Sequence, residues 1–233
     1  MNNTLDFGVV LHGQYGAMLL SGIKLTLQLA LGSWLLAMAL AVLLVLLRLA
    51  NKRVTTALVA VYVSYHRNVP TLIQLMIWYF AIPTLLPASV QIWLNNFNSE
   101  FVFSLTALGL CQAAYFCEDI RSGLRAIPSG QTEAARALGM GYIRSMRWVI
   151  LPQSIRNALP ALINHTVLLF KNTSLAMVIG VAELTYATRE IENYTFRTFE
   201  VYLISSVAYL ACSLLLMGAG AILAQRYQRA LAR

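Results

Sequence analysis

Long apolar runs separated by short polar stretches dominate this chain, and the clearest run extends from Leu19 to Leu47. A helix crosses the hydrocarbon core of a bilayer with about 20 consecutive, mostly apolar residues. The pattern predicts five such spans: Leu19–Leu47, Pro70–Leu86, Phe101–Cys117, Ala158–Val181 and Val201–Ala224. We therefore expect an all-α integral membrane protein that forms a single transmembrane domain over residues 1–233.

The segment 54–67, between the first two predicted spans, is also apolar but too short to cross a bilayer. It follows the basic pair Lys52-Arg53 and ends at His66-Arg67. Such a segment lies along the inner membrane interface or extends the second span, and the pattern allows both arrangements.

Basic residues gather in alternate connections between the spans, which predicts the orientation of the chain. They are Arg48, Lys52, Arg53 and Arg67 after the first span, Arg121, Arg125, Arg136, Arg144, Arg147 and Arg156 after the third, and Arg226, Arg229 and Arg233 after the fifth. The segment 87–100 after the second span has no Lys or Arg. Since loops rich in Lys and Arg stay in the cytoplasm, we expect the N-terminus outside and the C-terminus inside.

The composition supports a membrane location. Only 11% of the residues are charged, whereas soluble domains carry about 25%. The net charge of +8 lies beside apolar runs, which favours contact with membrane lipid over nucleic acid. The three cysteines, Cys111, Cys117 and Cys212, lie in apolar segments without metal-ligand spacing, so we expect no metal site and interpret them as core residues.

The loop 118–156 between the third and fourth spans has the most distinctive pattern. Ser129 follows Ile-Pro and is predicted to cap a short, alanine-rich helix that has Glu133 in its first turn. Gly139 and Gly141 are predicted to end this helix in the left-handed conformation.

A second short helix is expected at Tyr142–Ile150 and is predicted to end at Pro152. Small alanine side chains let another surface approach closely. From the residues alone, two arrangements remain open. The loop docks into a groove of a cytoplasmic partner, or it packs only against its own spans.

A motif in this loop favours docking. Glu133-Ala134-Ala135 is followed after three residues by Gly139, and after nine more by Val149-Ile150-Leu151-Pro152. This spacing resembles the EAA loop of ABC importer permeases, although Val149 stands where isoleucine is usual. In that family the loop forms coupling helices that fit a cleft on the ATPase subunit. The resemblance implies ATPase coupling by Glu133, Ala134, Ala135, Gly139 and Pro152.

Other segments resemble the polar amino-acid branch of these permeases. They are Arg67-Asn68-Val69-Pro70 with Gln74, Ala113-Ala114-Tyr115, Glu118 to Gly123, and Lys171 to Leu175. The resemblance implies a bacterial inner-membrane permease with three kinds of partner: a cytoplasmic ATPase dimer, an extracellular or periplasmic solute-binding protein, and a second permease subunit, either a copy of this chain or a paralogue. ATP and Mg²⁺ belong to the ATPase, because the chain has no GxxxxGK[ST] motif. We expect no enzyme activity and no bound cofactor.

Polar residues inside the fourth span form the candidate substrate site. His165 and Asn172 are seven residues apart, which places them on one helix face about 10 Å apart. Polar groups in a bilayer face the bundle interior or a water-filled cavity. The predicted substrate-binding residues are His165, Lys171, Asn172 and Thr173.

The resemblance also bears on the transported solute. In family members that import basic amino acids, the positions matching His165 and Asn172 tend to be acidic. This chain has no acidic residue at either position, which argues against lysine or arginine as the solute. The segment 67–87 most resembles glutamate/aspartate permeases. We therefore favour an acidic amino acid. A neutral polar, basic or amino-acid-derived solute is the alternative.

Less specific interpretations apply to the same residues. His165 and Asn172 could only hydrogen-bond neighbouring helices, Lys171 could extend to the interface, and Arg67 is interpreted as an anchor at the inner membrane face. An ion-coupled secondary transporter is a weaker alternative, because such proteins usually have more spans and an internal repeat. No HExxH or GxSxG motif supports an intramembrane enzyme.

Overall fold

The computed structural model describes residues 5–50, 52–96 and 98–230, so Arg233 lies outside the described residues. In this part of the chain all regular structure is helical. The elements are α1 (Phe7–Leu11), α2 (Gly13–Leu49), α3 (Arg53–Asn68), α4 (Thr71–Met76), η1 (Ile77–Ala81), η2 (Ile82–Leu85), α5 (Ala88–Asn95), α6 (Ser99–Arg125), α7 (Ser129–Ala137), α8 (Tyr142–Ser145), η3 (Met146–Ile150), α9 (Leu151–Asn172), η4 (Thr173–Ile179), α10 (Leu184–Thr195) and α11 (Thr198–Ala230).

The predicted all-helical membrane fold is confirmed, with one change to the spans. Among the described residues, four helices are long and apolar enough to cross a membrane: Gly13–Leu49, Ser99–Arg125, Tyr142–Ile179 and Thr198–Tyr227. The predicted second span, Pro70–Leu86, is not a separate long helix. It pairs with α3 across a bend of 106°, and the two together make a fifth candidate span.

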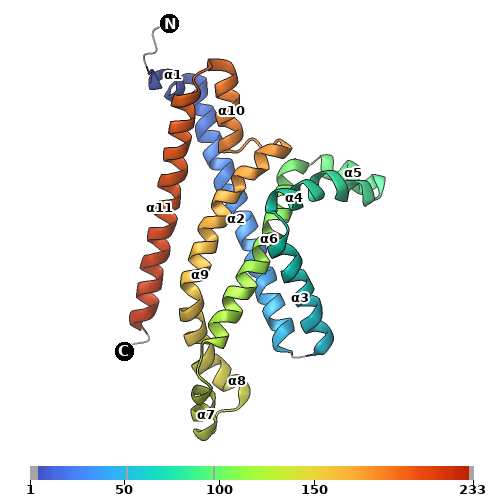
Figure 1. Cartoon of the computed structure of the whole chain (residues 1–233), viewed down its shortest axis with the longest axis vertical. Helices are drawn as coiled ribbons and strands as arrows, with labels where there is room; N and C mark the ends of the chain where they lie inside the picture. Colours follow the sequence, from blue (N-terminus) through green and yellow to red (C-terminus); the bar gives the residue numbers. More distant parts are fainter. Residues whose placement is uncertain (1–4, 51, 97, 231–233) are drawn as a thin grey trace.

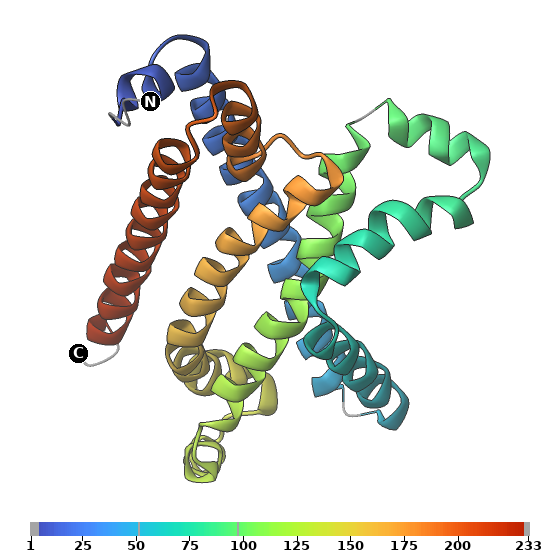
Figure 2. The same cartoon turned by 45° about the horizontal axis from the view of Figure 1, so that its top comes forward.

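Pro70 explains this bend. A proline pushes the preceding residue out of the helical conformation, and Val69 is extended, with φ −95° and ψ 130°. Gln74 holds the two helices across the bend, because its side-chain amide donates to the carbonyl of Val69 at 2.7 Å and to that of His66 at 3.1 Å. Figure 2 shows α3 and the α4–α5 segment diverging from this point.

The elements cluster at two ends of the helical bundle (Figure 1). The short helices α1 and α10 lie at the same end as the start of α2, whereas α7 and α8 lie at the opposite end. The C-terminal end of α11 points toward the end that holds α7 and α8. This arrangement agrees with the predicted separation of the N-terminus from the coupling loop, but which end faces the cytoplasm stays a prediction.

Small residues place α6 at the centre of the bundle. In its most apolar 18-residue window, 61% of the residues are buried, compared with 6% in α11. Ala113 and Ala114 of α6 pack with Ala37 and Ala41 of α2 in one fully buried cluster. Small side chains allow helix backbones to approach closely in a membrane. The apolar outer face of α11 is left for lipid or for another subunit.

The helices of the coupling loop differ from the sequence prediction in three details. Pro128, not Ser129, occupies the cap position of α7, and no side chain caps the helix. Gly139 is left-handed as predicted, with φ +75°, but Gly141 has φ −67° and precedes α8. Because a backbone with negative φ does not require glycine, Gly139 and not Gly141 needs to be glycine on conformational grounds.

The predicted helix end at Pro152 is wrong. Residues 142–179 form one helical span that continues through both Pro152 and Pro160. Pro152 falls in the first turn of α9, directly after the π-helical turn η3. A proline interrupts the hydrogen bonds of a regular helix, and a π-turn changes their spacing locally. This change in spacing lets the helix continue past Pro152.

Candidate functional site

Two regions of the structure contain the predicted functional residues, and the first is the coupling loop. The helix α7 ends in a Schellman motif: the N–H of Gly139 donates to the carbonyl of Arg136 at 2.9 Å, and that of Met140 to Ala135 at 3.0 Å. Glu133 and Ala134 are exposed, whereas Ala135 is buried against the chain itself. The predicted coupling residues therefore divide into an outward-facing group and one inward-facing alanine.

Large apolar side chains of the same loop are exposed. The sequence analysis did not include them among the predicted functional residues. Leu138 is 77% exposed, Ile143 80% and Trp148 67%. Tyr142 beside them is also exposed. We define these four residues as the loop patch. Large exposed apolar side chains are typical of surfaces that contact another protein or lipid. Their position as large apolar residues in a loop rich in arginine is the sequence feature that could have identified them.

The second region is a polar cluster between α6 and α9. Nδ1 of His165 lies 2.6 Å from a carboxylate oxygen of Asp119. The ring of Tyr115, one helical turn from Asp119, lies 5.1 Å from the His165 ring, centroid to centroid. The guanidinium carbon of Arg67 lies 5.5 Å from the centre of the Tyr115 ring, a cation–π contact. Tyr115 thus connects His165 to the bend after α3.

Asp119 is the residue of this cluster that sequence reasoning missed. It is 7% exposed and supplies the carboxylate that the His165 position itself lacks. The pairing depends on how α6 and α9 cross, and no spacing within the sequence encodes that crossing. His165 therefore has a partner within the chain, which supports its interpretation as an interhelical contact. The His165 side chain nevertheless stays 28% exposed.

A polar cleft of about 550 Å³ opens beside this cluster, between α3 and α6. Its lining includes Arg48, Arg67, Tyr115, Glu118 and Arg121. Glu118 accepts from Arg48 at 2.7 Å and from Arg121 at 2.6 Å. Arg67 has no carboxylate partner among the residues that the structure describes. Among the described residues, Arg67 is therefore the arginine of this cleft without any ion pair, although the sequence suggested it only as an anchor.

The other predicted substrate residues lie at the far end of α9. Lys171 is exposed and Asn172 is half-buried where α9 changes to the 3₁₀ helix η4. Thr173 is fully buried, and its hydroxyl donates to the carbonyl of Phe170 at 2.7 Å. These three residues do not line the polar cleft. Their contact with a solute stays a prediction.

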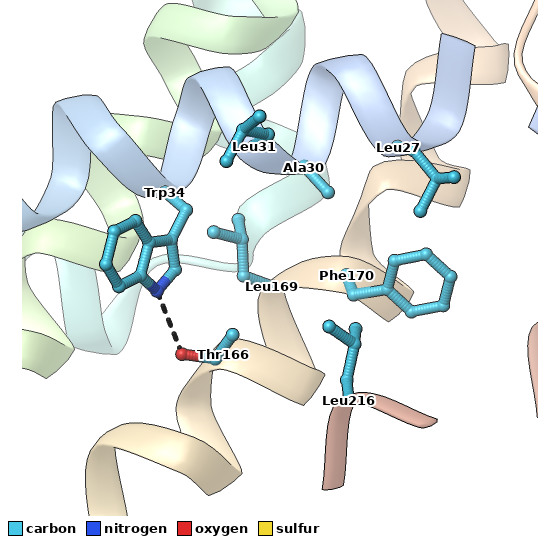
Figure 3. A pocket seen from close by; sticks show the side chains of 8 residues that line it. All are labelled: Leu27, Ala30, Leu31, Trp34, Thr166, Leu169, Phe170 and Leu216. Atoms are coloured by element: carbon cyan, nitrogen blue, oxygen red, sulfur yellow. Dashed lines mark hydrogen bonds between the residues drawn. The ribbon is translucent and has the colours of Figure 1, made fainter. Parts of the chain in front are cut away.

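An apolar groove of about 450 Å³ lies between α2, α9 and α11 (Figure 3). Its walls include Leu27, Leu31, Phe170 and Leu216, and Trp34 donates to the hydroxyl of Thr166 at 3.0 Å across it. A polar amino acid would lose its hydration there without gaining hydrogen bonds. The groove suits a lipid chain or a neighbouring helix better than a polar solute.

Another buried polar residue, Glu183, is the N-cap of α10, at the end of the bundle opposite the coupling loop. Its side chain is fully buried. It accepts hydrogen bonds from the N–H groups of Thr185 and Tyr186 at 3.0 and 2.9 Å and from the hydroxyl of Tyr209 at 2.7 Å. Burial raises the pKa of Glu183 above its ordinary value. This carboxyl group fixes α10 to α11.

The described residues contain no group of three or more His, Cys, Asp or Glu side chains placed to hold a metal ion. A bundle of long apolar helices with a polar cleft agrees with the predicted membrane permease. Residues 35–229 match the family of binding-protein-dependent transport system inner membrane components, and the chain belongs to this family. It is a permease subunit of an amino-acid ABC importer.

Curated relatives of this chain are named as permeases for different solutes. The glutamate/aspartate import permease GltJ of Escherichia coli K12 is 30% identical over 204 residues, covering 84% of this chain and 82% of that protein. The nopaline permease NocM of Agrobacterium fabrum is 34% identical over 194 residues, covering 82% and 80%. The arginine permease ArtQ of Bacillus subtilis is 32% identical over 198 residues, covering 85% and 87%.

Solved structures agree with this assignment. A crystal structure of an amino acid ABC transporter with histidines has a TM-score of 0.84 and 30% identity, covering 96% of this chain and 99% of the other. An inward-facing structure of the methionine transporter MetNI has a TM-score of 0.70 at 19% identity, covering 93% and 99%. The second likeness concerns the fold alone.

Proposed function

We propose that this permease imports an acidic amino acid, glutamate or aspartate. The observation that carries the proposal is the unpaired guanidinium of Arg67 in the polar cleft, next to Tyr115. A solute with two carboxylates and one ammonium has a net negative charge, which a free arginine stabilises by charge-assisted hydrogen bonds. The glutamate/aspartate name of one relative is consistent with this choice.

A basic solute is the second candidate, because Asp119 adds a carboxylate beside the cleft and one relative is named for arginine. Asp119 is already paired with His165, so an incoming cation would have to displace that contact or share it. Arg67 would in addition repel a guanidinium or a second ammonium. These two effects favour the acidic solute.

We further propose that transport is driven by a separate ATPase dimer that binds the coupling loop. The exposed groups of Glu133, Ala134 and Gly139 would fit its groove, with the loop patch providing apolar anchors. Apolar side chains buried at the centre of an interface usually contribute most of its binding energy. A second permease subunit completes the path, and a solute-binding protein delivers the amino acid on the other side.

Uptake into proteoliposomes tests the solute. The complete importer, with its ATPase and binding protein, is reconstituted with ATP inside, and radiolabelled glutamate, aspartate, glutamine, histidine and arginine are compared. We expect ATP-dependent uptake of glutamate or aspartate. Uptake of arginine alone would contradict the acidic assignment and leave the importer intact. An assembled complex that transports no amino acid would contradict the function itself.

Replacing Arg67 by lysine or glutamine refines this test. We expect Arg67→Gln to weaken acidic amino-acid uptake, with KM raised about tenfold, as for loss of one charge-assisted hydrogen bond. Arg67→Lys should restore part of it. Equal KM values for all three proteins would make Arg67 an anchor, as the sequence first suggested.

A further inference from the structure

A second basic cavity lies where α2 and α6 end, at the point from which the coupling loop follows α6. It has a volume of about 300 Å³ and shares Arg48 and Arg121 with the polar cleft, but the rest of its lining is different. Arg125 adds a third guanidinium to this cavity. The remaining wall consists of Val45, Leu49, Leu124 and Thr56, so most of the additional lining is apolar.

The cations of this cavity are only partly neutralised. Glu118 is the single carboxylate that pairs with Arg48 and Arg121, so one of their two charges has no counterpart. Arg125 has no ion pair among the residues that the structure describes. In addition, Nε of Arg48 is buried without a hydrogen-bond partner. A buried donor of this kind usually has an acceptor.

The shape of the cavity selects the class of anion. A guanidinium cluster suits a phosphate group, whose oxygens accept paired N–H donors. The leucine and valine wall would gain nothing from inorganic phosphate, but it suits a hydrocarbon chain. Both features occur together in one class of molecule, the anionic phospholipids, which bind in basic pockets between membrane helices.

We propose that this cavity binds an anionic phospholipid such as phosphatidylglycerol. Its phosphodiester lies against Arg48 and Arg125, and an acyl chain lies along Val45, Leu49 and Leu124. Bound there, the lipid neutralises the charge that Glu118 leaves uncompensated. It also holds the end of α6, from which the coupling loop begins. The proposal concerns the ends of α2 and α6 and does not depend on which amino acid is transported.

Photo-labelling of the assembled importer in nanodiscs tests the proposal. The probe is phosphatidylglycerol with a diazirine in one acyl chain, and labelled peptides are located by mass spectrometry. We expect labels on the ends of α2 and α6, and protection by unlabelled phosphatidylglycerol but not by phosphatidylcholine or inorganic phosphate. Arg125→Gln should reduce this labelling about fivefold, the share expected for one arginine at an anionic lipid, and Arg125→Lys should restore it.

Arg226→Gln is the matched control, because it removes an exposed arginine near the end of α11 and outside the cavity. Its labelling should match that of the unchanged protein. An equal loss in both glutamine variants would indicate general attraction to the membrane and overturn the site. Protection by inorganic phosphate would identify a free-anion site instead. The absence of labels at α2 and α6 in the unchanged importer would overturn the lipid site.

Discussion

The coupling loop and the junction between α6 and α9 place their predicted functional groups in opposite ways, although the loop connects these two helices. The loop directs Leu138, Ile143 and Trp148 into the surroundings. The junction buries Asp119 against His165. A surface that binds a partner needs unsatisfied apolar area, whereas a polar group within a membrane needs a partner of its own. Our proposal therefore assigns docking to the exposed loop and solute passage to the junction of the two helices.

The junction is the region where a single change should have the largest effect. In Gly123→Val, the added Cβ would lie 2.4 Å from the carbonyl oxygen of Ser154 and 2.8 Å from Cβ of Ala158. Overpacking of this kind destabilises a core by about 1–3 kcal/mol, and a backbone oxygen cannot turn aside. We expect a lower thermal unfolding midpoint of the purified complex and loss of uptake.

Gly218→Val is the matched control, since an added Cβ at Gly218 on α11 meets nothing within 4 Å. The complex with this variant should unfold near the midpoint of the unchanged one. Equal midpoints for Gly123→Val and Gly218→Val would mean that α6 and α9 do not approach as closely as described.

In the coupling loop a comparable substitution should affect transport without unfolding the protein. Gly139→Val forces a branched residue into φ +75°, which costs about 1–2 kcal/mol and disturbs the Schellman motif that ends α7. We expect uptake and ATP hydrolysis stimulated by the binding protein to fall about tenfold, with a fall in the unfolding midpoint no larger than that of Gly123→Val.

Two substitutions distinguish backbone conformation from size at this position. Gly139→Asn should keep most of the uptake, because asparagine tolerates the left-handed region. Gly141→Ala should be neutral, because its φ of −67° suits alanine and the space around it is open. Normal ATPase binding and uptake by Gly139→Val would contradict the coupling role of the loop.

Replacing His165 should have a moderate effect, on selectivity more than on stability. His165→Gln removes the imidazole contact with Asp119 and leaves that carboxylate free to attract a cation. We expect KM for the acidic amino acid to rise about tenfold, the equivalent of one hydrogen bond to a charged group, with relatively better arginine binding. Radiolabelled competition uptake measures both quantities.

Thr166→Val, on the next residue of α9, provides the comparison for His165. It removes the bond to Trp34 in the apolar groove and should leave the selectivity unchanged. The same selectivity in His165→Gln and in the unchanged importer would assign the Asp119–His165 pair to helix packing alone.

The smallest effect is expected at Glu183, where the carboxylate has its donors within the chain. The raised pKa of Glu183 means that its carboxyl group binds a proton more tightly in the native protein than in the unfolded chain. This stabilisation is complete below the ordinary pKa of 4.5 and is lost as the pH rises through the raised value. Glu183→Gln cannot titrate, so its unfolding midpoint should fall less over this range. Identical pH profiles would contradict the assignment.

Patterns that depend on neighbours along the chain were readable in advance. The apolar runs indicated the four long helices, since membrane insertion depends on the summed hydropathy of one segment. The spacing of Glu133, Gly139 and Pro152 indicated the coupling loop, and Gly139 has the predicted left-handed backbone. The helix end predicted at Pro152 was wrong because a π-helical turn precedes that proline. No local sequence pattern predicted this turn.

Hydropathy and motif spacing in this sequence predicted a helical membrane permease with a helical loop between two spans, because both patterns depend on neighbouring residues. Only the tertiary structure decided that α3 and α4 meet at 106°, that Asp119 pairs with His165, and that Arg67 faces a polar cleft. These features depend on how helices far apart in the chain cross. The crossings are set by small side chains such as Gly123, whose role becomes visible only when the opposing backbone is present.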